Sequence, residues 1–494
     1  MEQNYILSID QSTSGTKALL FDKTGALVAR HDKAHRQITN SLGWVEHDPN
    51  EIYQNMLFTA GQVLQNAQIN PAQVRAIGIS NQRETGVMWD RKGEPIYHAV
   101  VWQCARGKEI CQELEAQGLA SFVKDTTGLN LSPYFTAAKW AWLMRNVRDA
   151  KALAQRGDFF CGTMDSWLIF KLTGNHKTDY SNASRTQLFD IGTLTWNEEL
   201  CRAFGIPVFS LPEVCFSDSI FGTTDFEGLF PKKIPVCGVM GDSHAALFAQ
   251  GCWTSGMTKA TYGTGSSVMM NTGERRVFHK DLVSSLAWGI GGKVSYVLEG
   301  NINYTGAVFQ WLCDDLKLIS SPKEASSLAS SVKSSDGVYL IPAFSGLGAP
   351  YWQSEARALL CGMGRNTRKE HIVRAAEECI AYQIKDIIEA MNQGSDYRLP
   401  QLRVDGGPTH DAFLMQFQAD ILGVPVAVSK MEELSGGGAA YLAGISSGLY
   451  LKETLLQNCC PELFSPSMKG EEIAHLYNGW KRAVRRTIFC PEVL

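Results

Sequence analysis

Two aspartates follow strand-like segments, at positions where a carboxylate could bind a ligand or take part in a reaction. Asp10 ends the apolar run 5–9, and Asp242 follows the apolar run 234–240 and precedes a helical segment. Beside phosphate-binding hydroxyls a carboxylate usually requires a cation, so Asp10 is a candidate for assisting Mg²⁺. Asp242 could accept the proton of an attacking alcohol. The structural alternatives are an ordinary turn residue at position 10 and a helix N-cap at position 242.

Basic and aromatic residues that could bind an acceptor accompany these carboxylates. Arg83 and Glu84 follow the strand-like run 76–80. Together they could donate to and accept from vicinal hydroxyls, although an exposed charged loop is the alternative for an adjacent Arg-Glu pair. Trp102 and Tyr134 could form the walls of a polar pocket, although core packing is the ordinary role of such residues.

Two segments far apart in the sequence share one plan of strand, polar turn and strand. They are residues 5–22 and residues 257–271. Both turns are rich in Gly, Ser and Thr, which expose backbone N–H groups and hydroxyls to an anion. Two such turns facing each other would hold a polyphosphate from both sides. The sequence therefore predicts two related domains with a nucleotide between them.

Two further glycine-rich segments precede helices. Gly406 and Gly407 follow the strand-like run 402–405, where paired glycines allow close approach to the nucleoside end of ATP or simply form a tight turn. For Gly436–Gly438 the main prediction is close packing of a helix on a sheet, with lining of the nucleotide site as the second interpretation.

Strand-like runs alternate with amphipathic helices along the chain, which indicates an α/β protein. Residues 51–66 and 412–422 carry apolar residues at helical spacing. The serine-rich stretch near 320–335 resembles a linker, but Ser321-Pro322-Lys323-Glu324 has the form of a capping box and predicts a helix. A break near 248–256 places the predicted domain boundary between residues 1–251 and 252–494.

Composition excludes several classes of protein. The chain has 494 residues, 45% hydrophobic and 19% charged, which is a globular composition. A net charge of −4 gives no reason to expect nucleic acid or an anionic membrane as partner. The 13 cysteines lack metal-ligand spacing, and their odd number argues against a complete disulfide framework. Without a long apolar run or a signal-peptide profile, a soluble cytoplasmic protein is expected.

Taken together, the motifs resemble the FGGY carbohydrate kinases along nearly the whole chain, and most closely their glycerol kinase branch. The stretches that carry the resemblance are residues 43–48, 81–85, 99–104, 134–143, 179–185, 261–265, 344–352, 402–407 and 413–418. The resemblance implies an α/β fold of two actin-like (ribonuclease H-like) domains, with ATP and Mg²⁺ in a central cleft.

The resemblance also assigns roles by position. Asp10 would assist the metal, and Asp242 would be the general base. The residues implied for the acceptor are Arg83, Glu84, Trp102, Tyr134, Asp242, Ser243 and Ser267. Those implied for the nucleotide are Thr13, Ser14, Lys17, Gly263, Thr264, Gly306, Gln310, Gly407 and Asp411. A small polyol or sugar would be phosphorylated on a primary hydroxyl.

The acceptor site departs from the glycerol kinase pattern at three positions. Ser243 and His244 replace two glutamines, and Ser267 replaces a phenylalanine that would lie against the glycerol backbone. These changes open and polarise the pocket, which predicts an acceptor larger or more hydroxylated than glycerol, such as a tetritol, pentitol or ketopentose. A true glycerol kinase is the alternative.

Other departures lie away from the acceptor. Asp411 replaces a common asparagine near the nucleotide, and Glu377 stands where an apolar residue is usual. Residues 224–233 lack the Gly-rich, Arg-bearing loop of fructose 1,6-bisphosphate regulation, so that control is expected to be absent. A homodimer or homotetramer is common in the family.

Two functions from other classes stay open at the level of sequence. An actin- or Hsp70-like ATPase would share both hairpins but would not need Arg83, Glu84 and a second carboxylate. A sugar-sensing pseudokinase would bind without turnover, and the intact Asp10 and Asp242 argue against it.

Overall fold

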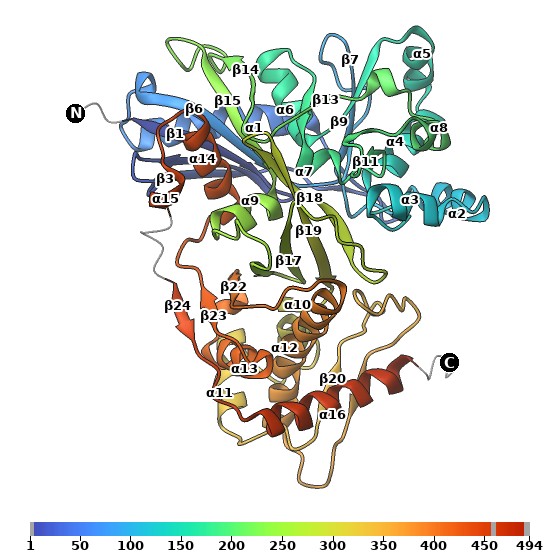
Figure 1. The fold of residues 1–494 in the computed structure, drawn as a ribbon, viewed down its shortest axis with the longest axis vertical. Coiled ribbons are helices and arrows are strands. Elements are labelled where there is room, and N and C mark those ends of the chain that lie inside the picture. Colours follow the sequence, from blue (N-terminus) through green and yellow to red (C-terminus); the bar gives the residue numbers. More distant parts are fainter. Residues whose placement is uncertain (1–3, 456–460, 489–494) are drawn as a thin grey trace.

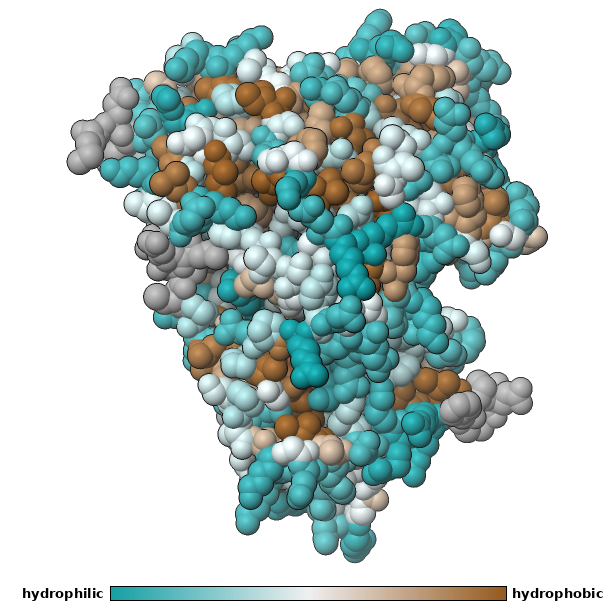
Figure 2. Space-filling view, viewed as in Figure 1, coloured by the Kyte–Doolittle hydropathy of each residue, from teal (hydrophilic) through white to brown (hydrophobic). Residues whose placement is uncertain are grey.

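The computed structural model describes residues 4–455 and 461–488. Two α/β regions lie end to end, with the N-terminal half of the chain above and most of the C-terminal half below (Figure 1). Figure 2 shows polar and apolar side chains interspersed on one face, with polar residues covering most of its lower part. No helix among the described residues is long and apolar enough to cross a bilayer.

The upper region is built on a six-stranded sheet. Its strands are β1 (Tyr5–Gln11), β2 (Gly15–Phe21), β3 (Leu27–Ala34), β6 (Val74–Asn81), β14 (Ile220–Thr224) and β15 (Ile234–Gly241). They follow the order β14-β15-β6-β1-β2-β3, in which β1, β6 and β15 are parallel. Asn81 pairs with both Gln11 and Gly241, so these three strands end at one edge. This register brings the segments after Asp10, Asn81 and Gly241 together.

The lower region repeats this plan in a seven-stranded sheet. Its strands are β16 (Thr258–Tyr262), β17 (Ser266–Gly273), β18 (Val283–Ile290), β19 (Lys293–Ile302), β22 (Leu402–Asp405), β23 (Val426–Val428) and β24 (Glu462–Phe464). The order is β18-β19-β17-β16-β22-β23-β24. The hairpin β16–β17 corresponds to β1–β2, and β16 runs parallel to β22 as β1 does to β6.

Shorter strands and the helices complete both regions. A five-stranded sheet joins β4 (Ile38–Thr39), β5 (Val45–His47), β8 (Ala99–Val100), β7 (Gly86–Asp90) and β9 (Phe159–Thr163). Three two-stranded pairs are β10 (Lys177–Asp179) with β13 (Glu213–Cys215), β11 (Phe189–Asp190) with β12 (Thr195–Trp196), and β20 (Tyr339–Ile341) with β21 (Leu359–Cys361). The helices of the upper region are α1 (Pro49–Asn66), α2 (Lys108–Ala116), α3 (Ala120–Thr127), α4 (Thr136–Asn146), α5 (Arg148–Arg156), α6 (Met164–Thr173), α7 (Tyr180–Ala183), α8 (Glu198–Phe204) and α9 (Asp242–Ala249). Those that follow are α10 (Gly306–Gln310), α11 (Pro322–Ser330), α12 (Lys369–Gly394), α13 (Ala412–Leu422), α14 (Leu434–Ser446), α15 (Lys452–Leu455) and α16 (Gly470–Ile488).

Helix α14 returns from the C-terminal part of the chain to the N-terminal sheet, beside β1 and β6 (Figure 1). Its glycines allow backbones to touch, because a Cβ at Gly438 would lie 1.9 Å from the carbonyl oxygen of Ala245 in α9. A Cβ at Gly78 of β6 would similarly lie 2.4 Å from the carbonyl oxygen of Ala439. The predicted packing role of Gly436–Gly438 is therefore confirmed, and the division at residues 251 and 252 stays a prediction.

Most predicted elements are present in the structure. The two hairpins and the helices predicted at 51–66 and 412–422 are confirmed as β1–β2, β16–β17, α1 and α13. The stretch near 320–335 forms α11, as predicted, but the capping box is wrong. Ser321 makes no side-chain cap, and Glu324 instead accepts from the backbone N–H and hydroxyl of Ser320.

Gly438→Ala tests the close packing of α14 on α9. Alanine gains about 1 kcal/mol in helix propensity, but overpacking against a backbone carbonyl costs roughly 1–3 kcal/mol. We expect the thermal midpoint to fall. Gly61→Ala in α1 is the matched control, because no described atom outside its own helix backbone lies within 4 Å, and its midpoint should rise. A rise for both variants would contradict the packing role.

Candidate functional site

Arg83 and Asp242 meet at the edge where β6 and β15 end. Arg83 Nε donates to Asp242 Oδ1 at 3.2 Å. The Arg83 side chain is buried, with 7% exposed, whereas 34% of the Asp242 side chain is exposed. The two residues that the resemblance assigns to the acceptor therefore meet in the structure, with the carboxylate open to a ligand and the guanidinium behind it.

Arg83 and Arg185 share one buried acid from the lower sheet. Glu299 of β19 accepts from Arg83 Nη2 at 3.0 Å and from Arg83 Nη1 at 3.2 Å. It also accepts from Arg185 Nη1 at 2.7 Å, and Arg185 Nε donates to Glu84 at 2.5 Å. The two guanidiniums hold the pKa of Glu299 below its ordinary value despite burial, which by itself raises the pKa. A chain of alternating charges thus runs from Glu84 to Asp242 through both regions.

Glu84 has a backbone conformation that few non-glycine residues adopt. Its φ is 60°, in the left-handed region, and the side chain is 2% exposed. Such strain persists where surrounding contacts enforce it, and it is concentrated at functional sites. Here the conformation turns Glu84 toward Arg185, while the preceding Arg83 turns toward Glu299 and Asp242. The adjacent pair therefore engages separate partners within one network.

Helix α9 begins at Asp242, and Gly241 takes the N-cap position. Asp242 Oδ1 accepts from the backbone N–H of Ser243 at 2.6 Å. The alternative that Asp242 is the N-cap of this helix is therefore wrong. Its second oxygen, Oδ2, makes no hydrogen bond within the described residues, and this half-exposed carboxylate is positioned to accept a proton.

The three residues that depart from the glycerol kinase pattern lie around this pair. Ser267 Oγ donates to Glu299 Oε1 at 3.1 Å, so this residue of β17 belongs to the same network. Ser243 is half-buried beside Asp242. His244 is fully buried, and within the described part of the chain neither ring nitrogen has a hydrogen-bond partner. Burial first, and then the positive charge of Arg83, lower the pKa of His244 and favour a neutral ring.

The first hairpin presents a polar turn next to this network. Ser14 is exposed and Thr13 half-buried, so this turn is open to a ligand. Asp10 is 4% exposed and accepts from Ser80 Oγ at 2.5 Å. Burial raises the pKa of Asp10 to about 6, and the opposing charge of Lys17 is the largest influence that lowers it. Lys17 Nζ lies 3.9 Å from Asp10 and 2.6 Å from Glu433, which precedes α14.

Trp102 links the predicted acceptor residues to this hairpin. Its indole Nε1 donates to Thr13 Oγ1 at 2.9 Å. Its ring meets the ring of Tyr134 edge to face, with centroids 5.7 Å apart. Trp102 therefore forms a wall next to Tyr134 and also fixes the hydroxyl of Thr13, a role that sequence reasoning did not predict.

The second hairpin turn lies against the start of α10. The backbone N–H of Gly306 donates to the carbonyl of Gly263 at 2.9 Å, and that of Ala307 donates to Thr264 at 3.1 Å. Gly263 and Thr264 are exposed. Gly406 has a φ of 104°, and a Cβ there would lie 1.9 Å from the carbonyl oxygen of Tyr262, so only glycine fits. The structure thus brings Gly263, Thr264, Gly306 and the Gly406-Gly407 turn together; Gln310 lies exposed at the end of α10.

Asp411 and Glu377, each identified separately as a departure, lie close enough for the charge of Asp411 to act on Glu377. Asp411 caps α13 by accepting from the backbone N–H of Leu414 at 3.0 Å, and Ser326 Oγ donates to it at 2.8 Å. Glu377 of α12 is fully buried. Burial and then the negative charge of Asp411 raise the pKa of Glu377 to about 9, so it is a neutral carboxylic acid near pH 7. Near pH 7 the buried Glu377 therefore adds no negative charge to this region.

A magnesium ion would have to use few protein ligands here. The described residues contain no group of three or more His, Cys, Asp or Glu side chains that could hold a metal ion. Mg²⁺ that binds with substrate phosphates usually takes one or two carboxylates and keeps several waters. The buried Asp10 carboxylate beside an exposed hydroxyl-rich turn fits that donor set.

Sequence reasoning missed the role of three buried charged residues. Glu299 and Arg185 join the network described above. Lys259 of β16 is fully buried and donates to Thr261 Oγ1 at 2.8 Å; burial lowers its pKa, and Asp405 opposes that effect. A charged residue inside a strand was the available signal for Glu299 and Lys259, but the partners of Glu299 lie on distant segments. Arg185 lies in the loop after α7 and offered no such signal.

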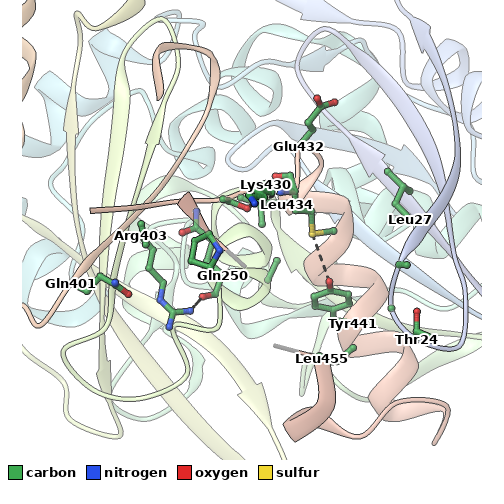
Figure 3. A pocket seen from close by; sticks show the side chains of 17 residues that line it. Thr24, Leu27, Gln250, Gln401, Arg403, Lys430, Glu432, Leu434, Tyr441 and Leu455 are labelled. Carbon is green, nitrogen blue, oxygen red and sulfur yellow. Dashed lines mark hydrogen bonds between the residues drawn. The ribbon is translucent and has the colours of Figure 1, made fainter. Parts of the chain in front are cut away.

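A pocket of about 560 Å³ lies elsewhere, between the β2–β3 turn, the end of α9, β22, β23 and α14 (Figure 3). Arg403 there donates to the carbonyl of Gln250, and Tyr441 donates to the sulfur of Met431 at 3.7 Å. None of the predicted site residues lines it.

Comparisons with known proteins agree with this architecture. Residues 5–249 match the N-terminal domain of the FGGY family of carbohydrate kinases, and residues 258–447 match its C-terminal domain. Glycerol kinase 1 of Thermotoga maritima is 49% identical over 491 residues, covering 98% of this chain and 99% of its own. The glycerol kinase of Alkaliphilus oremlandii is 47% identical over 492 residues, covering 98% of both chains.

Solved structures give the same result. Plasmodium falciparum glycerol kinase with ADP superposes with a TM-score of 0.93 at 36% identity, covering 98% of each chain. A ligand-bound xylulose kinase from Lactobacillus acidophilus shares the fold alone, with a TM-score of 0.87 at 22% identity over 98% of this chain and 99% of that chain. The predicted two-domain α/β kinase fold is confirmed, and the glycerol kinase alternative gains more support than a larger acceptor. The chain belongs to the FGGY family of carbohydrate kinases.

Proposed function

We propose that this kinase transfers the γ-phosphoryl group of ATP to a primary hydroxyl of a small polyol, with glycerol as its acceptor. The observation that carries the proposal is the contact between Arg83 and the half-exposed Asp242, at the sheet edge that also holds the Asp10 hairpin. Relatives named glycerol kinases, 45–49% identical over nearly the full chain, support glycerol as the first acceptor to consider.

The acceptor would lie against Arg83, with Trp102 and Tyr134 as walls. Asp242 would accept the proton of the attacking hydroxyl through its free oxygen, and the buried Arg83 would orient the hydroxyl and balance the charge of the base. Glu84 would accept from a second hydroxyl. Closure of the two regions would exclude water, which would otherwise consume ATP without product.

The nucleotide would lie between the two hairpin turns. Backbone N–H groups and hydroxyls of Thr13, Ser14 and Thr264 would bind the phosphates, and Gly263 would allow them to approach the turn closely. Gly306, Gln310, Gly407 and Asp411 would lie toward the nucleoside, and Lys17 would add positive charge beside Asp10. When bound at Asp10, Mg²⁺ would neutralise charge on the β- and γ-phosphates.

A longer polyol or a ketopentose is the second candidate acceptor. Its support is specific: Ser267 places a hydroxyl on Glu299 where an aromatic wall would otherwise stand, and Ser243 is half-buried beside the base. A site that hydrogen-bonds extra hydroxyls can reject analogues that lack them by about 10⁴-fold. Comparing kcat/KM for glycerol, erythritol, xylitol, ribulose and xylulose separates the candidates; clear preference for glycerol removes the longer acceptor.

An ATPase without an acceptor and a pseudokinase are disfavoured by the same geometry. Neither function requires an exposed carboxylate fixed by a buried arginine beside a phosphate-binding turn. We also propose a cytoplasmic location and a small-molecule partner, without nucleic acid or membrane insertion. A homodimer or homotetramer and the absence of control by fructose 1,6-bisphosphate stay predictions.

Asp242→Asn should lower kcat by roughly 10²- to 10⁴-fold, because the amide cannot accept the proton. The thermal midpoint should stay close to that of the wild-type protein, since the carboxylate is half-exposed. Asp158→Asn, at an exposed ion pair with Arg91, is the control and should keep normal turnover. Near-normal turnover of Asp242→Asn in a coupled ADP assay would remove Asp242 from the mechanism.

Ser267→Phe should raise kcat/KM for glycerol relative to erythritol by about tenfold. A buried aromatic wall is worth roughly 1.5–3 kcal/mol to a short apolar backbone, and it takes the space of a longer acceptor. Ser267→Ala is the control, since it removes the hydroxyl without adding a wall. If Ser267→Phe shifts selectivity toward erythritol, or leaves it unchanged, Ser267 does not line the acceptor site.

A further inference from the structure

We propose that Glu299 is a positioning residue for phosphoryl transfer, because it holds the Arg83 guanidinium in the orientation that leaves Asp242 free to act as a base. This role rests on the function proposed above. It assigns a task to a residue of the lower sheet that makes no direct contact with Asp242.

The contacts divide the donors of Arg83 between two acids. Glu299 takes both terminal nitrogens, Nη2 at 3.0 Å and Nη1 at 3.2 Å, which fixes the plane of the guanidinium. Only Nε then faces Asp242, at 3.2 Å. A single contact at this distance leaves the second carboxylate oxygen available to an acceptor hydroxyl.

The partners come from different sheets. Arg83 follows β6 of the upper sheet, and Glu299 lies in β19 of the lower sheet. The Glu299 side chain has no exposed surface, so it forms these bonds away from competing water. The orientation of Arg83 therefore depends on the placement of the two sheets relative to each other.

Other charged groups around the network constrain what loss of Glu299 would do. Arg185 and Glu84 form the next pair, and Lys259 and Asp10 lie on the neighbouring hairpins. His244 and Tyr134 also lie near the network. Without the Glu299 charge, Arg83 would find its nearest anion in Asp242. A closer or bidentate contact there would occupy the base and withdraw Arg83 from the acceptor.

Two variants separate the charge of Glu299 from its shape. Glu299→Gln keeps the shape and removes the charge, whereas Glu299→Asp keeps the charge and shortens the side chain. Steady-state kinetics of the full-length protein would use ATP with glycerol, and with whichever acceptor the panel above selects. Glu274→Gln is the matched control, because Glu274 pairs with Lys293 of the same strand β19 but is exposed.

For Glu299→Gln we expect the acceptor KM to rise by about 10- to 100-fold and kcat to fall, as for loss of hydrogen bonds between charged groups. The KM for ATP should change by no more than about twofold, because the hairpin turns are untouched. Glu299→Asp should show the same selective defect in a milder form, and Glu274→Gln should match the wild-type protein.

The proposal is overturned if Glu299→Asp is impaired as much as Glu299→Gln. Equal defects would indicate that Glu299 acts through packing and not through its charge. An equal rise in both KM values, or unchanged kinetics, also overturns it. If Glu299→Gln does not fold, a folded Glu299→Asp with an unchanged acceptor KM is sufficient to reject it. Absence of polyol-dependent ADP release from the wild-type protein would instead overturn the proposed function, and this role with it.

Discussion

The buried ion-pair network centred on Glu299 is the interaction on which the site depends. Charges removed from water must be paired, because breaking a buried pair costs several kcal/mol, about 3–5 when one partner is lost. Glu299 pairs with Arg83 and Arg185 only when β19 of the lower sheet lies against the loops that follow β6 and α7 of the upper region. The contacts that orient the candidate acceptor site are thus also contacts between the two halves of the molecule.

The repeated sheet plan supplies the geometry around this network. In each sheet an antiparallel hairpin precedes a parallel strand, so a polar turn and a following loop share one edge. The upper edge gathers Asp10, Arg83 and Asp242, and the lower edge gathers the Thr264 turn and the Gly406-Gly407 turn. Function-bearing residues from distant parts of the sequence meet because parallel strands end together.

The sequence alone predicted the features that depend on residues close together in the chain. Turn residues between apolar runs predicted both hairpins, and the motifs that carry the family resemblance placed Arg83 and Asp242 at one acceptor site. Partners that lie far apart had no such signal: nothing near Glu299 indicates Arg185, and nothing near Trp102 indicates its bond to Thr13. The Ser321 capping box failed because Glu324 bonds to Ser320. The influence of Asp411 on Glu377 became visible only when α12 and the start of α13 were placed together.

The most direct test of the account is ADP release by the wild-type protein with ATP and Mg²⁺, measured with and without glycerol or a longer polyol while the phosphorylated polyol is quantified. If Asp242 acts as a base held by Arg83 at the acceptor site, the polyol should strongly stimulate ADP release. One polyol phosphate should then form for each ADP released. ADP release that proceeds equally fast without any polyol, and yields only inorganic phosphate, would contradict the account.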